Sequence, residues 1–178
     1  MLRSWLSDHH TQKDGIWLIS YKKHTAHHVP YGDIVEECLC FGWVDSLPRS
    51  LDDARSMLYL APRRKGSKWS KANKARVEAL VADGLMKHAG LQKIEQAKKD
   101  GAWDALNEVE AGVLPDDLKE ALSGNDQARK HFEAFPPSSR CLILEWISNA
   151  RKSETRIKRI HETVDKAARN IRANHYRQ

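Results

Sequence analysis

Apolar residues follow a strand-like pattern in the first part of the chain and a helical pattern in the rest. Segment 15–23 is rich in β-branched and aromatic residues, and segments 43–47 and 56–61 share this composition. This composition predicts three short strands. Residues 48–53 are rich in turn formers, and Pro62 closes the third strand. We therefore predict a small, mostly antiparallel sheet in the N-terminal third.

Helical spacing of apolar residues predicts helices in the other segments. A short helix is expected over 2–10, and a second helix opens near Pro30 and stops at Gly42. After Ser70 every periodic segment reads as helix, and the expected ranges are 71–83, 89–100, 115–122, 127–134, 139–151 and 154–172. The predicted fold class is α+β, with a small sheet packed with helices followed by an all-helical C-terminal half.

The length and composition set the expected organisation. A chain of 178 residues with 40% hydrophobic content can bury one sizeable core. We expect a single domain over 1–178, divided into a sheet-containing core at 1–105 and a helical subdomain at 106–178. No run approaches the roughly 18 apolar residues of a membrane span, and the start lacks the apolar run of a signal peptide. The three cysteines have no CxxC spacing. These features predict a cytoplasmic protein with buried thiols and no membrane insertion.

The net charge of +6 is concentrated near the C-terminus. Segment 136–178 holds ten Lys and Arg against four Asp and Glu, so the first 135 residues are balanced. This asymmetry is typical either of a solvated helix face or of a protein that binds nucleic acid. The residues that would contact phosphates are Arg151, Lys152, Arg156, Lys158, Arg159, Lys166 and Arg169. They are spread around the helix rather than aligned on one face, and no motif specifies an oligomeric state.

A second basic segment, 62–77, has the sequence PRRKGSKWSKANKARV and contains seven positive residues and no negative one. Ser70 is a natural N-cap for the helix that follows. A helix start favours acidic residues by about 0.3–1 kcal/mol. Here Lys71 and Lys74 occupy the first turn instead, which suggests that a small anionic ligand supplies the missing charge. The predicted ligand-binding residues are Arg63, Arg64, Ser67, Trp69, Ser70, Lys71 and Asn73.

Two alternatives concern this basic segment. Acidic side chains from elsewhere, such as Asp45, Asp52 or Asp53, could neutralise it within the protein. Trp69 could stack on a base or ring of a ligand, but a tryptophan beside a helix cap more often packs into the core.

The sequence gives a weaker indication of catalysis at Asp45. Asp45 follows an apolar run and could carry a proton in an enzyme of unknown reaction, with Arg63 or Arg64 positioning an anionic substrate. Alternatively, Asp45 is a structural partner of an arginine. Strand alternation suggests that Tyr21, Lys22 and Tyr59 could face the same cleft as Asp45.

Metal and cofactor signals are lacking. The nine histidines cluster early but match neither HExxH nor a Cys/His zinc spacing, so we expect no metal site. Phosphate-loop, dinucleotide and nucleophile-elbow motifs are lacking too, and we expect no cofactor.

Several strings resemble the YdeI/OmpD-associated family, also called bacteriocin-protection proteins. In the N-terminal half these are GIWL, YKK, LCFGWVD, LDD, APRR, SKWS and Asn73, and in the C-terminal half GLM, AKKDGAW, LPDDL and ETRIKRI. The resemblance implies a bacterial cytoplasmic protein linked to tolerance of stress, cationic peptides or bacteriocins. It carries no catalytic residues over to this chain. Ser46 stands where the family often has glycine, which removes the basis for a tight turn there.

Overall fold

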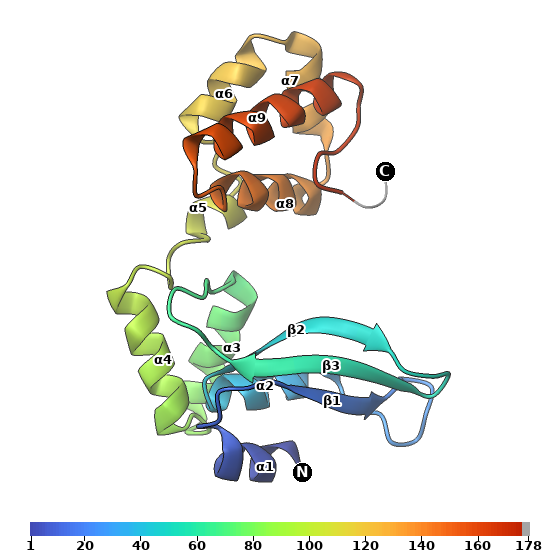
Figure 1. Cartoon of the computed structure of the whole chain (residues 1–178), viewed down its shortest axis with the longest axis vertical. Coiled ribbons are helices and arrows are strands. Elements are labelled where there is room, and N and C mark those ends of the chain that lie inside the picture. Colours follow the sequence, from blue (N-terminus) through green and yellow to red (C-terminus); the bar gives the residue numbers. More distant parts are fainter. Residues whose placement is uncertain (176–178) are drawn as a thin grey trace. The chain divides into compact units, whose positions relative to one another are not determined.

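Residues 1–175 are described in a computed structural model of the chain (Figure 1). The chain divides into two compact units, Met1–Ala105 and Leu106–Gln178, which we call the N-terminal and C-terminal units. Within the described residues no helix is long and apolar enough to cross a membrane.

The N-terminal unit is built on a three-stranded antiparallel sheet in the order β1-β3-β2. The strands are β1 (Ile16–Tyr21), β2 (Trp43–Ser50) and β3 (Arg55–Pro62). Together with the helices of both units, this sheet confirms the predicted α+β fold class.

Strand β2 runs further than the sequence predicted. Residues 48–50 were expected in a turn, but they continue pairing with β3 after an irregularity between Asp45 and Pro48. Because β2 is an edge strand, Pro48 can lie in it without breaking a ladder in the middle of the sheet. The turn is therefore shorter than predicted and lies between Ser50 and Arg55.

One face of the sheet packs on helices. Leu58 and Leu60 point to this face and are buried together with Trp43 and with Leu39 of the helix that follows β1. The helices of this unit are α1 (Leu2–His9), α2 (Tyr31–Cys40), α3 (Lys71–Ala82) and α4 (His88–Lys99). In Figure 1, α2 lies behind the strands.

The C-terminal unit is helical and has its own core, in which Phe132, Ile143, Ile147 and Ile160 are buried. Its helices are α5 (Asn107–Glu110), α6 (Asp116–Ser123), α7 (Asp126–Ala134), α8 (Pro137–Ser148) and α9 (Ser153–Ala168). The sequence did not predict the four-residue helix α5.

Helix α9 also ends earlier than the predicted residue 172. Asn170 has a left-handed backbone with φ of 57°, and the Ile171 amide donates to the Lys166 carbonyl at 2.9 Å. This is the hydrogen-bonding pattern that closes a helix with a residue in the left-handed conformation. The apolar period continues to Ile171, so periodicity alone overestimated the length of the helix.

Candidate functional site

The basic segment begins with a loop that leaves β3 and leads to α3. The Arg63 amide donates to the Gly42 carbonyl at 2.9 Å, which ties the start of the loop to the end of α2. Gly66 has φ of 74°, a conformation that glycine adopts without strain. The chain thereby turns back, and the Ser67 amide donates to the Arg64 carbonyl at 3.2 Å. Local turn chemistry thus positions the side chains of this loop.

Arg63 is the most unusual residue of the loop because its side chain is charged and only 3% exposed. Its guanidinium lies over the Trp69 ring, 3.7 Å from the centroid. Its Nη1 donates to the Lys68 carbonyl at 3.1 Å and to Ser67 Oγ at 3.4 Å. Its Nε is buried without a hydrogen-bond partner. Burial lowers the pKa of Arg63 to about 10, while the charge of Asp45 acts in the opposite direction, so the guanidinium stays positive at neutral pH.

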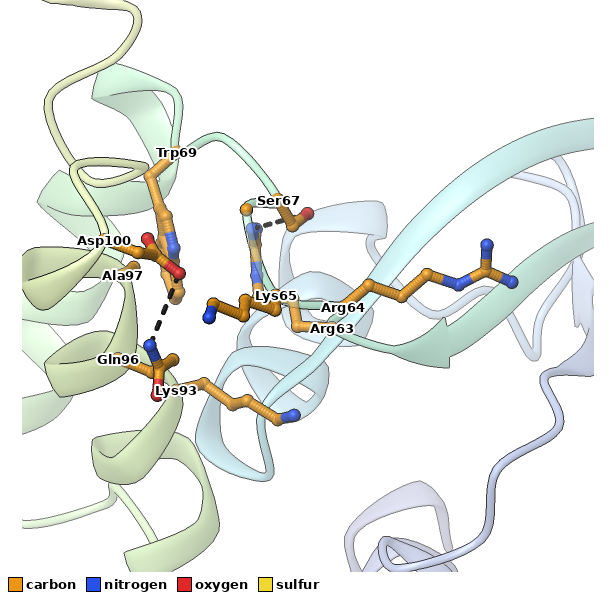
Figure 2. Close-up of a pocket in the computed structure, with 10 residues that line it drawn as sticks. Arg63, Arg64, Lys65, Ser67, Trp69, Lys93, Gln96, Ala97 and Asp100 are labelled. Carbon is orange, nitrogen blue, oxygen red and sulfur yellow. Dashed lines mark hydrogen bonds between the residues drawn. The ribbon is translucent and has the colours of Figure 1, made fainter.

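A pocket of about 220 Å³ opens beside this guanidinium (Figure 2). Loop 63–69 and helix α4 form its walls, and four of its side chains are basic while one is acidic. Figure 2 shows Lys65 extended toward the α4 side of the pocket, whereas Arg64 points away from it. The lining residues are Arg63, Arg64, Lys65, Gly66, Ser67, Trp69, Lys93, Gln96, Ala97 and Asp100. The pocket is therefore a positively charged cavity with room for a small anionic group.

The start of α3 lies outside this pocket. Ser70 caps the helix as predicted, because its hydroxyl accepts from the Asn73 amide at 3.3 Å. The Asn73 side chain accepts from Arg76 Nη1 at 3.2 Å. Lys74 pairs with Asp104 at 3.5 Å, so part of the basic segment is neutralised internally, by an acid other than the three considered from the sequence. Of the predicted ligand-binding residues, Arg63, Arg64, Ser67 and Trp69 line the pocket, whereas Ser70, Lys71 and Asn73 do not.

Trp69 packs into the core, which was the alternative to stacking on a ligand. The side chain is 1% exposed, and its ring lies 5.1 Å from that of Trp103. Arg63 occupies one face of the indole. Trp69 therefore supports the guanidinium rather than offering a free ring to a ligand.

Helix α4 supplies residues that the sequence analysis missed. Lys93 and Gln96 of α4 line the pocket together with Asp100, which directly follows the helix, and their spacing places them on one side. Asp100 is held in place because its carboxylate accepts from the Ala102 amide at 3.1 Å and from Gln96 Nε2 at 3.4 Å. This spacing is visible in the sequence, but only the packing of α4 beside the loop connects it with Arg63.

Asp45 lies in a different pocket, of about 410 Å³, together with Tyr21, Lys22 and Tyr31. Asp45 is half-buried, and its Oδ2 accepts from the Tyr31 hydroxyl at 2.5 Å. Burial and this hydrogen bond raise the pKa of Tyr31 to about 12. Tyr21 and Lys22 thus line the same pocket as Asp45, as suggested from strand alternation, but Tyr59 lines another groove. Asp45 and Arg63 line separate pockets.

Several basic side chains of the C-terminal unit are engaged within it. Arg156 forms a bidentate pair with Asp117, at 2.5 and 2.8 Å, and this pairing lowers the pKa of Asp117. Lys166 pairs with Glu162 at 2.7 Å. Arg159 stacks on Trp146 at 5.0 Å and donates to its carbonyl. The basic residues of α9 therefore act partly as internal ties.

The three thiols are free, and the described residues form no cluster of metal ligands. Cys38 and Cys40 are buried and Cys141 is half-buried, and all three are free. Burial raises the pKa of Cys38 to about 12. Among residues 1–175, no group of three His, Cys, Asp or Glu side chains could hold a metal ion.

The fold and the site define a class of small α+β protein. A sheet-containing unit with a basic loop pocket is followed by a separate helical unit. The chain belongs to the family of the domain of unknown function DUF8412, whose model matches residues 1–93. Residues 111–170 match the model of the bacteriocin-protection, YdeI or OmpD-associated family. The N-terminal strings that suggested the second family therefore lie mostly in the segment that the first family matches. No curated protein and no solved structure matches the chain.

Proposed function

We propose that this bacteriocin-protection-type protein binds a small anionic ligand in the pocket between loop 63–69 and α4. The family match supports the protection-type function at the level of the family. The anionic ligand is our inference from the pocket, and the observation that carries it is the state of Arg63. A buried guanidinium with an unpartnered Nε lies beside a cavity whose walls carry further positive charge.

The orientation of Arg63 favours binding over a purely structural role. A free arginine side chain has about 2 kcal/mol of rotamer entropy. Stacking on Trp69 and hydrogen bonds to Ser67 and Lys68 already restrict this side chain before any ligand arrives. Preorganised donors lose less entropy on binding, so affinity rises.

The size and charge of the pocket limit the ligand. A cavity of about 220 Å³ is smaller than the roughly 300–1,000 Å³ typical of sites for drug-sized molecules. Arg63, Lys65 and Lys93 are donors without acceptor capacity, which suits phosphate, sulfate or carboxylate oxygens. The ligand, or the part of it held here, is therefore a single anionic group.

Titration with inorganic phosphate at constant ionic strength tests the proposal, with thermal unfolding and calorimetry as readouts. Phosphate at about ten times its Kd should stabilise the protein by about 1.4 kcal/mol. Arg63→Lys loses the planar fork, and a lost hydrogen bond to a charged group of about 1.5–3 kcal/mol weakens binding about ten- to 150-fold. Lys65→Met removes an exposed charge worth about 0.5–1 kcal/mol, which corresponds to roughly a two- to fivefold loss.

Two further variants make the experiment specific. Asp100→Asn removes the acidic charge from the lining and should tighten phosphate binding. Lys119→Met removes one positive charge from α6, outside the pocket lining, and should leave the affinity unchanged. The proposal is refuted if phosphate and sulfate do not bind, or if Lys65→Met and Asp100→Asn both bind phosphate as the wild type does.

A further inference from the structure

The second face of the sheet in the N-terminal unit is open. Pairing places Trp17 opposite Tyr59 and Ile19 opposite Met57, on the face away from the buried Leu58 and Leu60. Three residues of β1 on this face, Trp17, Ile19 and Tyr21, are 37%, 51% and 43% exposed. A strand with one buried face normally has polar residues on its solvent-facing side. Three exposed aromatic or aliphatic side chains at alternate positions of β1 therefore indicate an interaction surface.

The open face combines aromatic rings with positive charge. The rings of Trp17 and Tyr59 lie 5.2 Å apart. Arg49 of β2 reaches across β3 and places its guanidinium 4.9 Å from the Trp17 ring. In the three strands the only acidic residue is Asp45, whose pairing with Leu60 places it on the buried face. The open face is therefore aromatic and basic and has no strand carboxylate.

A groove connects this face with the anion pocket. The groove has a volume of about 570 Å³, and Tyr59 and Ala61, which belong to the open face, form part of its wall. Lys13 adds a positive charge, although Asp14 adds a negative one. Three basic residues, Arg63, Arg64 and Lys93, line both the groove and the anion pocket. The aromatic face and the anion pocket are thus two ends of one surface.

We propose that this surface binds single-stranded nucleic acid, with bases stacked on the open face and phosphates held along the groove and in the anion pocket. The inference rests on the proposed function for its phosphate contacts. Exposed aromatic rings interleaved with positive charge are the general means by which proteins hold unpaired bases and their backbone. A purely apolar partner would leave the basic side chains of the groove unmatched.

The extent of the surface favours a strand over a free nucleotide. From Trp17 to Tyr21 the strand spans about 13 Å, at about 3.3 Å per residue. The groove and the anion pocket extend the surface beyond Tyr59. One base with its phosphate can occupy only part of this length, so several successive nucleotides would be needed to cover it. Paired bases in a duplex are stacked on each other and do not offer their faces to Trp17.

Fluorescence anisotropy with a labelled single strand of about ten thymidines, a typical site size, tests the proposal on the full chain. We expect binding that weakens between about 50 and 200 mM salt, because phosphate contacts release counterions. Trp17→Leu should weaken binding about five- to 150-fold, the range measured for loss of one stacked base. It should leave the affinity for inorganic phosphate unchanged. Lys65→Met should weaken binding of both probes.

Trp146→Leu is the matched control. Trp146, like Trp17, has an arginine stacked on it, but it is half-buried and lies on α8 in the C-terminal unit. Its replacement should leave the affinity for the strand unchanged. If Trp17→Leu does not fold, Arg49→Met on the exposed edge strand takes its place and should also weaken binding.

The outcomes separate this proposal from the preceding one. If phosphate binds but the strand does not, or if Trp17→Leu and Arg49→Met bind the strand as the wild type does, the nucleic-acid proposal is overturned and the anion pocket stands. If thymidine monophosphate binds as tightly as the strand, the ligand is a free nucleotide. If a duplex binds as tightly as the strand, stacking of bases on Trp17 is excluded. Either result also overturns the nucleic-acid proposal. If neither phosphate nor the strand binds, both proposals fail.

Discussion

Replacement of Gly90 by alanine tests the packing that brings α4 to the pocket. Gly90 is buried in α4, against the end of α2. A Cβ at this position would lie 2.4 Å from the Cys40 carbonyl oxygen and 2.6 Å from that of Leu39. Both contacts are with backbone atoms, which cannot rotate away as a flexible side chain can. Helix α4 would have to move away from α2.

The change in the free energy of unfolding for Gly90→Ala is the sum of two opposing effects. Overpacking of a core typically costs about 1–3 kcal/mol, and two backbone contacts this short place Gly90→Ala near the upper end. Alanine in place of glycine within a helix returns about 1 kcal/mol. We therefore expect a net loss of about 2 kcal/mol. For a unit of about 100 residues this corresponds to a decrease in Tm of roughly 8–16 °C.

The same substitution at Gly32 is the matched control. Gly32 lies in α2, and a Cβ there would meet nothing within 4 Å. Gly32→Ala should therefore stabilise the protein by about 0.5 kcal/mol, chiefly because it restricts the unfolded chain. Urea and thermal unfolding followed by circular dichroism measure both changes.

Gly90→Ala should also weaken phosphate binding, because α4 carries Lys93 of the pocket lining. If the Gly90→Ala variant is as stable as the wild type, or if both glycine substitutions change the stability equally, then α2 and α4 do not approach as closely as described.

Two further predictions concern Ser70 and Tyr31. Ser70→Ala removes the N-cap of α3 and should cost about 1 kcal/mol in urea unfolding. Phosphate affinity should be unchanged, since Ser70 does not line the pocket; a fully retained stability, or a loss of affinity, would contradict this assignment. Tyr31 has its pKa raised to about 12 in the folded protein, so the stability it contributes is present below its unfolded pKa near 10 and is lost as pH rises through 12. Tyr31→Phe should therefore remove a phenolate that forms near pH 12 in an alkaline absorbance titration, and an unchanged signal near pH 12 would refute the Tyr31–Asp45 hydrogen bond.

The accuracy of the sequence predictions depends on how local the signals are. Ser70 caps α3 as predicted because the cap contacts only the next turn of the same helix. Strand β2 was predicted too short because Pro48 is a turn signal in isolation, and only pairing with β3 makes it part of an edge strand. The end of α9 was placed too late because Asn170 is a weaker signal for a left-handed cap than glycine would be.

For the candidate site too, the sequence shows local features but not contacts between distant segments. The run of positive charge from Arg63 to Arg76 is plain in the sequence, and the pocket does begin at Arg63. A basic first turn is unfavourable at the positive end of the helix dipole, and this predicts an anion at the helix start. In the structure Lys74 of that turn is paired with Asp104, and the pocket is lined by loop 63–69 and α4 without Ser70, Lys71 or Asn73.

The sequence by itself determined the α+β class, the position of most helices and strands, and the basic segment in which the pocket begins. These features depend on periodicity, capping and turn residues, whose effects act over a few neighbouring positions. Only the tertiary structure decided which positive side chains share a cavity. Burial of Arg63 on Trp69, the contribution of Lys93 from α4 and the open aromatic face around Trp17 all depend on contacts between segments far apart in the chain. Such contacts leave no periodic signal in a single sequence, because packing of the whole unit sets them.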